Sequence, residues 1–425
     1  MRGIAKLMNN WQFAKPGEAA VAVDLPHTWN AKDGQDGGND YWRGTCTYTT
    51  TFDAPAFDKA TQQVWLQFEG VNASAKVTLN GIEICRHDNG YATFRAEITG
   101  LLQAQNALVV EVDNSVNDHV YPQKADFTFY GGIYRDVSLL TVNKDHIALG
   151  HCGDTGVKIT PAVKTGRADI TVETRVEGRG SVEVELLDAS GRQAAMASGE
   201  KAVLTLQNPH LWNGVKDPYL YTCVVRLRSE GEIVDEVRTR IGLRTFSVDA
   251  KKGFFLNGKP YPLHGVSRHQ DRKGLGNAIT REMHDEDMNL IRELGVNTVR
   301  LAHYQHDQYF YDLCDQYGMV VWAEIPYISE HLPNGRENTI SQMKELICQN
   351  YNHPSIVCWG VSNEITISTK DKADMLDNHH VLNDLCHKMD PTRLTTLACY
   401  AMCGPFNPVA HITDLVSWNL YLGWY

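Results

Sequence analysis

The sequence places an amide and a carboxylate side by side just after an apolar segment. Ile356–Val361 is apolar, and Asn363 and Glu364 follow one residue later. An apolar run of this length predicts a strand buried on both faces, as in a parallel sheet. Because α/β barrels keep their chemistry at the carboxyl ends of their strands, we expect these two side chains to line a site. The alternative is a strand that ends in an ordinary polar loop.

Other strand candidates in the same region also end in polar or aromatic side chains. The predicted strands are 261–266, 296–301, 319–325, 356–361, 394–399 and 415–420. The groups at their ends are His264 with 267–271, Arg300 with His303 and Tyr304, Glu324, Asn363 with Glu364, and Asn419 with Tyr421 and Tyr425. Sugars bind through several polar partners around the ring and through aromatic faces, so this rim predicts a pocket for a polyhydroxylated ligand. Singly, each group has a structural alternative; Glu324, for example, could be the buried partner of Arg300.

No motif indicates a cofactor. The sequence lacks a His-Glu-x-x-His pair, a phosphate-binding glycine loop and a Gly-x-Ser-x-Gly elbow. The acidic run 33–38 lacks the spacing and final glutamate of a calcium loop. We therefore expect no cofactor and no metal ligand, although a divalent or sodium ion is compatible with the sequence.

The elements that must position these residues alternate between strands and helices. Apolar residues keep helical spacing in 288–294, 310–317, 340–347 and 375–389, between successive predicted strands. Regular βα repetition predicts a parallel sheet with right-handed crossovers. Six strands allow either an open sheet or a barrel.

The chain before residue 249 reads as two β-domains. Strand-like alternation recurs in 46–52, 63–68, 75–79, 107–112 and 137–142, and again in 157–159, 168–176, 182–187, 220–227 and 233–241. We predict a β-sandwich over 1–144, an immunoglobulin-like sandwich over 145–248 and the α/β domain over 249–425. Two glycine-rich loops of the first sandwich, 33–44 and 125–135, either grip a ligand or only make tight turns.

Composition excludes several classes of function. A chain of 425 residues is expected to hold two or three domains, and 43% hydrophobic with 21% charged residues is ordinary for a globular protein. The net charge of -11 argues against nucleic acid or an anionic membrane as partner. The ten cysteines lack a Cys-x-x-Cys pair and are interpreted as reduced core residues. With no signal peptide or membrane span recognised, we expect a cytoplasmic protein.

Several motifs follow one another in order along the chain: 10–13, 25–30, 41–44, 131–137, 209–212, 297–304, 352–355 and, most specific, Trp359–Glu364. Together these motifs resemble glycoside hydrolase family 2, the β-galactosidases, β-glucuronidases and β-mannosidases. The resemblance implies a jelly-roll sandwich, an immunoglobulin-like domain and a TIM barrel.

The resemblance also implies roles for individual residues. Glu364 resembles the acid/base carboxylate of a retaining enzyme, and Asn363 the residue that binds the sugar 2-OH. A retaining glycosidase uses two carboxyl groups, one as nucleophile and one as proton donor. The other substrate-binding positions that match the family are His303, Asp126, Tyr421, Asn419, Tyr425 and Glu324.

The family places its nucleophile, a glutamate, at the end of barrel strand seven, whereas the sixth predicted strand is followed by Tyr425. We therefore expect a chain truncated within the barrel, with an open sheet edge. A fragment of a longer enzyme and a product that needs a complementing or identical partner chain are the two alternatives.

The sugar is predicted from the segment 419–425. This segment resembles galactosidase forms, whereas glucuronidases tend to carry an arginine where Leu420 stands. A uronate needs a cation, and none is obvious there. The sequence thus favours an exo-acting β-galactosidase over the alternative, a β-glucuronidase. A catalytically inactive sugar-binding fragment and a structural protein without a sugar site remain as further hypotheses.

Overall fold

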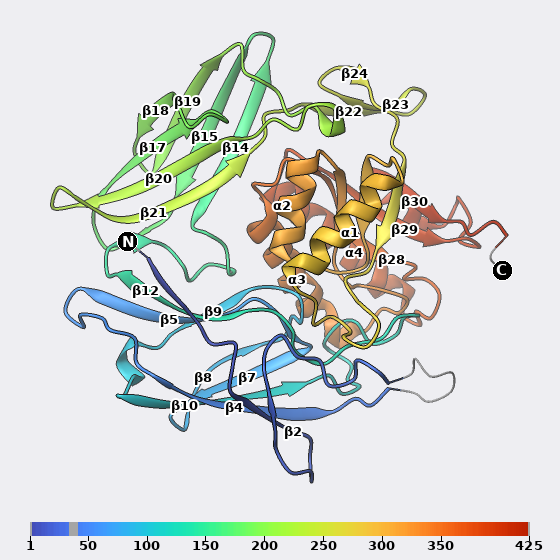
Figure 1. Cartoon of the computed structure of the whole chain (residues 1–425). Helices are drawn as coiled ribbons and strands as arrows, with labels where there is room; N and C mark the ends of the chain where they lie inside the picture. Colours follow the sequence, from blue (N-terminus) through green and yellow to red (C-terminus); the bar gives the residue numbers. More distant parts are fainter. Residues whose placement is uncertain (1, 34–40, 424–425) are drawn as a thin grey trace.

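Alternating burial along long strands builds an N-terminal β-sandwich (Figure 1). The computed structural model describes residues 2–33 and 41–423. Strands β4 (Thr45–Asp53) and β10 (Gln105–Asp113) bury alternate side chains and pair antiparallel along their whole length. This alternation turns one face of the sheet to the core and the other to solvent. The sheets run β1-β12-β5-β9 and β3-β2-β4-β10-β7-β8, beside the pair β11-β6.

The remaining elements of this sandwich are mostly short. They are β1 (Gly3–Lys6), β2 (Trp11–Ala14), β3 (Val21–Val23), β5 (Gln62–Phe68), β6 (Val71–Asn72), β7 (Ser74–Leu79), β8 (Ile82–His87), β9 (Phe94–Glu97), η1 (Thr99–Leu101), β11 (Gly132–Ile133) and β12 (Val137–Asn143).

A second, smaller sandwich follows. Its sheets have the orders β14-β15-β19 and β18-β17-β20-β21, with the pair β13-β16. Its elements are β13 (His146–Ile147), β14 (Val157–Lys164), β15 (Arg167–Thr174), β16 (Val176–Glu177), β17 (Ser181–Leu187), β18 (Gln193–Ser198), β19 (Lys201–Gln207), η2 (Gly214–Lys216), β20 (Tyr221–Ser229) and β21 (Glu232–Ile241). Trp212 lies between β19 and β20 and is fully buried beside Val320 and Val357 of the barrel. Its indole N–H donates to Asp315 O at 2.9 Å. This sandwich therefore packs against the amino end of the barrel strands.

Six parallel strands in sequential order form the third part, a curled half-barrel. They are β25 (Gly265–Arg268), β26 (Thr298–Leu301), β27 (Val320–Glu324), β28 (Ile356–Asn363), β29 (Leu394–Tyr400) and β30 (Leu415–Asn419). All eight residues of β28 are buried, as its apolar sequence predicts. The predicted fold class, two sandwiches and an incomplete TIM-type barrel, is confirmed.

The first barrel strand lies further along the chain than predicted. The sequence predicted 261–266, whereas β25 begins at Gly265. Prolines explain the shift: Pro260 ends the small antiparallel sheet of β22 (Phe246–Asp249), β23 (Gly253–Leu256) and β24 (Lys259–Pro260), and Pro262 cannot donate to a parallel ladder. His264 consequently precedes the strand and is exposed. The predicted domain boundary at 248/249 falls inside β22.

Four helices cover the outer face of the sheet. They are α1 (Arg281–Glu293), α2 (Gln308–Tyr317), α3 (Arg336–Asn350) and α4 (Lys372–Met389), with the 3-10 turns η3 (Pro333–Gly335) and η4 (Pro408–His411). Asp307 caps α2 by accepting from Tyr309 N at 2.8 Å, and Gly318 ends it at φ +77°. No helix among the described residues combines the length and apolar character needed to cross a membrane.

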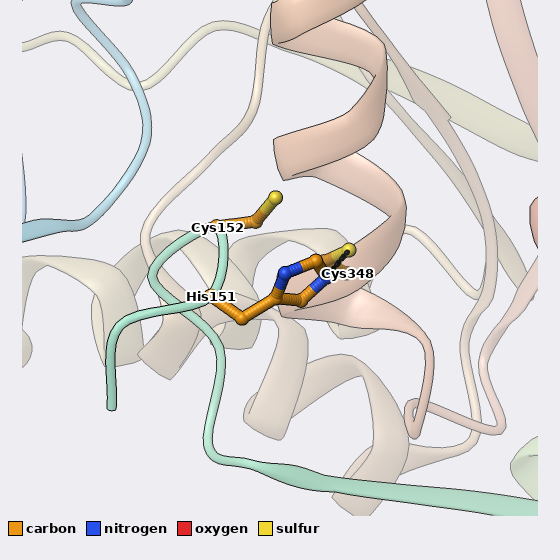
Figure 2. Close-up of side chains that lie close together, drawn as sticks. All are labelled: His151, Cys152 and Cys348. Atoms are coloured by element: carbon orange, nitrogen blue, oxygen red, sulfur yellow. Dashed lines mark hydrogen bonds between the residues drawn. The ribbon is translucent and has the colours of Figure 1, made fainter. Parts of the chain in front are cut away.

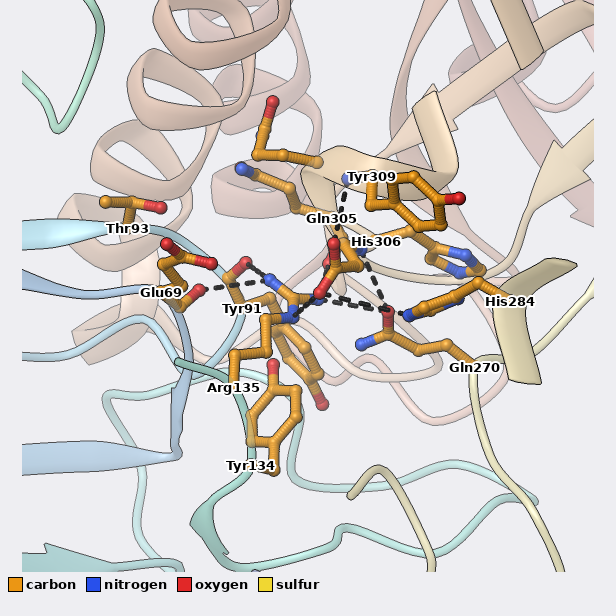
Figure 3. Close-up of polar contacts among 12 residues, drawn as sticks. Glu69, Tyr91, Thr93, Tyr134, Arg135, Gln270, His284, Gln305, His306 and Tyr309 are labelled. Atoms are coloured by element: carbon orange, nitrogen blue, oxygen red, sulfur yellow. Dashed lines mark hydrogen bonds and ion pairs between the residues drawn. The ribbon is translucent and has the colours of Figure 1, made fainter. Parts of the chain in front are cut away.

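The first sandwich docks onto the carboxyl end of the barrel. Tyr121, between β10 and β11, is buried in the barrel core, and its backbone N–H donates to Asn338 Oδ1 at 2.9 Å. Arg135, just after β11, inserts between the two domains and donates to Tyr91 O at 2.7 Å and to Gln305 O at 3.0 Å (Figure 3). The loop between β10 and β11 is thereby fixed beside the rim on which the polar strand ends lie.

Candidate active site

Strand β28 carries two of the predicted residues to the carboxyl rim of the sheet. The backbone N–H of Asn363 donates to Tyr327 O at 2.9 Å, and that of Glu364 donates to Ala398 O at 2.7 Å. The register between β28 and β29 shifts just before this point. Glu364 adopts a left-handed conformation, φ +51°, which costs a non-glycine residue of order 1–3 kcal/mol. The strand thus ends in a sharp turn that holds Glu364 half-buried on the rim.

Arg300, near the end of β26, connects the side chains of the rim. Its Nε and Nη2 donate to the two oxygens of Glu324 at 3.0 and 3.1 Å. Nη2 also donates to Asn363 Oδ1 at 2.8 Å, and Nη1 to Asn419 Oδ1 at 3.0 Å. One planar guanidinium therefore fixes groups from β27, β28 and β30 together. We refer to Arg300, His303, Glu324, Asn363 and Asn419 as the Arg300 cluster.

These donors fix the orientation of both amides. A guanidinium can only donate, so the atom of Asn419 that faces Arg300 is its oxygen, and its Nδ2 points the other way. That Nδ2 donates to Asn363 Oδ1 at 3.0 Å and to Glu364 Oε1 at 2.8 Å. Asn363 Oδ1 thus accepts from two donors, which leaves the Nδ2 of Asn363 as the group that can donate to a ligand.

Glu364 is held by one oxygen. Asn419 donates to Oε1, and within the described residues no hydrogen bond reaches Oε2. A carboxyl group anchored in this way keeps a fixed direction while its second oxygen stays available to gain and lose a proton. The geometry suits general acid/base chemistry.

Glu324 is the buried anchor of the cluster. Its side chain is 0% exposed, and Arg300 and His303 bind its oxygens. Burial alone would raise the pKa of Glu324, but the charges of Arg300 and His303 outweigh burial and lower the pKa. His303 Nδ1 lies 2.5 Å from Glu324 Oε1, so Nδ1 carries the hydrogen and Nε2 is left for a ligand. Glu324 therefore orients its neighbours.

Aromatic groups from both domains continue the rim beside His303. The ring of Phe127, in the sandwich loop, lies 5.9 Å from the ring of His303 and 4.9 Å from that of His269. Burial, followed by the nearby His303, lowers the pKa of His269 to about 4, so its ring is neutral at pH 7. Asp126, next to Phe127, is exposed, and its negative charge favours a higher pKa of His269, against the effect of burial.

The structure gathers most of the predicted site residues but not all. Glu364, Asn363, Asn419, Glu324 and His303 form one hydrogen-bonded set. Asp126 lies on the sandwich loop at the edge of this set. Tyr421 follows β30 and is 49% exposed, and Tyr425 lies outside the described residues. The individual ligand contacts of these residues stay predictions.

The sequence placed Arg300 and His269 among the polar strand ends and Phe127 in a loop that could grip a ligand, but it did not indicate which groups each of them contacts. The pairing of Arg300 with Glu324, considered as the structural alternative, is confirmed. The bonds from Arg300 to Asn363 and Asn419 were not predicted. The contacts of Phe127 with His303 and His269 carried no sequence signal, because they depend on how the sandwich docks onto the barrel.

Comparison with known proteins agrees with this architecture. The descriptions "Glycosyl hydrolase 2 galactose-binding domain-like", "Glycosyl hydrolases family 2" and "Glycosyl hydrolases family 2, TIM barrel domain" match residues 30–163, 154–244 and 247–425. The crystal structure of an FMN-binding beta-glucuronidase from Facaelibacterium prausnitzii L2-6 is 42% identical, with a TM-score of 0.97 over 100% of this chain and 68% of that one. The chain belongs to glycosyl hydrolase family 2.

Curated relatives carry two activities in their names. A beta-glucuronidase from Bacteroides fragilis is 38% identical over 99% of this chain and 64% of its own length. A beta-galactosidase from Thermoanaerobacter pseudethanolicus is 30% identical over 79% of this chain and 46% of its own length. The chain thus spans about half to two thirds of the length of these relatives.

Proposed function

We propose that this chain supplies the acid/base part of the active site of a retaining β-glycosidase that acts on β-glucuronides. The observation that carries the reaction type is Glu364, which Asn419 holds by Oε1 while Oε2 stays open on the rim. Family membership adds the expectation of glycoside chemistry. The proposed substrate is a small β-linked glycoside or oligosaccharide.

The proposed mechanism assigns each proton to an atom. Protonated Oε2 of Glu364 gives its proton to the glycosidic oxygen as the aglycone leaves and a glycosyl-enzyme ester forms on a nucleophilic carboxylate. Oε2 then takes a proton from the water that hydrolyses the ester. Nδ2 of Asn363 donates to a sugar hydroxyl, an interaction that strengthens in the transition state.

The nucleophile is assigned to no residue of the described chain. Glu324 reaches the same rim, but its two oxygens are bound by Arg300 and His303. Attack by such a carboxylate would break its bonds to Arg300 and His303, both of which are half-buried.

The proposed sugar differs from the one that the sequence favoured. The resemblance of 419–425 suggested a galactoside, whereas the relatives of 38% and 42% identity are both named beta-glucuronidases. The named beta-galactosidase of 30% identity keeps β-galactosides as the second candidate.

The test compares two aryl substrates on the longest natural protein that contains this chain. We expect kcat/KM for p-nitrophenyl β-D-glucuronide to exceed that for the β-D-galactoside by more than about tenfold, a difference of about 1.4 kcal/mol. A higher kcat/KM for the β-D-galactoside would make β-galactosides the substrate in place of β-glucuronides. Binding of glucuronate by calorimetry without turnover of either substrate would contradict the enzyme assignment and favour a sugar-binding protein.

A further inference from the structure

Three side chains of types that ligate metal ions meet where the loop after β13 contacts α3. His151 and Cys152 lie in the loop between β13 and β14, and Cys348 lies in the last turn of α3 (Figure 2). Their ligand atoms all lie within 4.8 Å of one another. His151 is exposed and both cysteines are half-buried, so an ion from solvent can reach them.

The separation of one sulfur and one nitrogen in this group fits a tetrahedral ion. With zinc bonds of about 2.3 Å to sulfur and about 2.0–2.1 Å to nitrogen, tetrahedral angles separate a sulfur from a nitrogen ligand by about 3.6 Å. Cys348 Sγ lies 3.7 Å from His151 Nε2. Two sulfurs and one imidazole select a thiophilic divalent cation such as Zn²⁺ over Mg²⁺ or Ca²⁺.

Hydrogen bonds hold the loop between β13 and β14 in place without an ion. Gln349, the neighbour of Cys348, donates from Nε2 to the backbone carbonyl of Cys152 at 2.7 Å. Arg95 donates to the carbonyl groups of Leu149 and Asp154 at 3.1 and 2.7 Å. These bonds clamp both ends of the loop, so the three ligands are brought together before an ion arrives.

Glycine allows the close approach of this loop to α3. Gly153 has φ +68°, and a Cβ at this position would lie 2.0 Å from Thr93 O and 2.7 Å from Gln349 Nε2. Only glycine fits there. The contact that places Cys152 against α3 is thus built into the sequence of the loop.

The adjoining cleft leaves room for a fourth ligand. It has a volume of about 210 Å³ and is lined by His151 and Cys348 together with Asp154, Lys158 and Arg175. Asp154 is already engaged, since it accepts from Gly156 N at 2.9 Å and pairs with Arg175. Water in the cleft is therefore the natural fourth ligand.

We propose that His151, Cys152 and Cys348 form a binding site for one thiophilic divalent cation of the Zn²⁺ type, which links the second sandwich to α3. The site has three protein ligands and an open fourth position. It is separate from the glycosidase chemistry, and its existence does not depend on the proposed function.

Cobalt is the probe, because Co²⁺ bound by thiolates shows sulfur-to-metal charge-transfer absorption. The full chain, freed of metal by a chelator and kept reduced by a phosphine, is titrated with Co²⁺ and then with Zn²⁺. We expect one Co²⁺ per chain, a thiolate band in the near ultraviolet, and loss of that band as Zn²⁺ takes the site. Zn²⁺ should also raise the midpoint of thermal unfolding.

Serine variants identify the ligands. Cys152→Ser and Cys348→Ser should each weaken Co²⁺ binding by more than the roughly 10–100-fold that changes of outer partners cause. Cys85→Ser, at a half-buried cysteine of β8, is the matched control and should bind as the parent does. Circular dichroism without metal checks that each variant folds, and His151→Ala supplies a second test that leaves both thiols in place.

Three results would overturn the proposal. They are a parent protein without the thiolate band, a band that survives in the double variant Cys152→Ser/Cys348→Ser, and a disulfide between these cysteines that persists in the reductant.

Discussion

Two arginines at the carboxyl end of the barrel, with little-exposed side chains, use their guanidinium groups in different ways. The side chains of Arg300 and Arg135 are 12% and 6% exposed. Among the described residues, Arg300 donates to side chains and to no backbone group; its acceptors include Glu324, Asn363 and Asn419. It therefore fixes the directions of groups that face the rim.

Arg135 donates mainly to the backbone. Three of its acceptors are carbonyl oxygens, of Glu69, Tyr91 and Gln305, and the fourth is Gln270 Oε1 (Figure 3). These bonds tie chain segments of the sandwich to segments of the barrel. We refer to this group as the Arg135 junction.

The acceptors of an arginine indicate whether it stabilises the fold or orients side chains. Donors that end on backbone carbonyls satisfy groups that must be paired in any folded state, so their loss is a loss of stability. Donors that end on side chains set side-chain directions, and a shift of about 1 Å in such groups can cost about 10²-fold in rate. Substitution of Arg300 should thus change mainly the reaction rate, and substitution of Arg135 mainly the free energy of unfolding.

The largest effect on activity within this comparison is expected for Arg300→Lys. Lysine keeps the charge but cannot hold three partners in one plane. We expect kcat to fall about 10²-fold, with a smaller change in the free energy of unfolding. Steady-state kinetics and urea unfolding measure both, and Arg179→Met, at an exposed arginine, is the control.

Arg135→Lys should have the opposite pattern of effects, a large loss of stability and little change in kcat. Each buried carbonyl left unpaired costs about 1–3 kcal/mol, so the free energy of unfolding should fall while kcat of the folded protein is kept. Urea unfolding and kinetics on the same samples measure this. A variant that loses activity with unchanged stability would remove the distinction between the two arginines.

Asn419→Ala should have a smaller effect on rate. It removes the donor to Glu364 Oε1 and one of the two donors to Asn363 Oδ1. Hydrogen bonds to charged groups are worth about 1.5–3 kcal/mol, so we expect kcat/KM to fall about 10- to 10²-fold. The loss should be greatest for substrates with poor leaving groups, which depend most on proton donation. Equal loss for all leaving groups would place Asn419 in sugar binding alone.

The smallest expected effect is a change in the pH dependence of stability at the Arg135 junction. Burial, followed by the charge of Asp307, raises the pKa of Glu69 from 4.5 to about 7. Between these values the folded protein binds more protons than the unfolded chain, so this contribution is present below pH 4.5 and is lost as the pH rises to about 7. Glu69→Gln should flatten the decline in urea midpoints over this range, whereas the exposed Glu232→Gln should not. A decline unchanged in Glu69→Gln would contradict the assignment.

The sequence predicted the elements better than the contacts between them. The apolar run of β28 and the polar strand ends have local signals, so Asn363, Glu364 and Asn419 could be placed on one rim. The Arg300 cluster has no local signal, because it depends on the register of β26, β27, β28 and β30, and Arg300 and Asn419 are 119 positions apart in the sequence. Only the folded sheet shows which partners the guanidinium reaches.

Two other differences have equally specific causes. Prolines displaced the first barrel strand, although its apolar residues suggested an earlier start. The cysteines were expected to be core residues, yet Cys85, Cys152 and Cys348 are only half-buried. Cys152 and Cys348 meet because Gly153 lets the loop approach α3, which their spacing in the sequence does not indicate.

Chemical rescue of Glu364→Gln tests whether Glu364 is the acid/base group. We expect kcat/KM on unactivated β-glucuronides to fall about 10²–10⁴-fold, since the proton donor is lost. With an activated aryl glycoside, azide should restore turnover and yield the β-glycosyl azide, because it attacks the glycosyl-enzyme without needing a general base. The matched control, Glu337→Gln in the exposed first turn of α3, should behave as the parent. Near-normal hydrolysis by Glu364→Gln, or rescue that yields the α-azide, would rule out this role for Glu364.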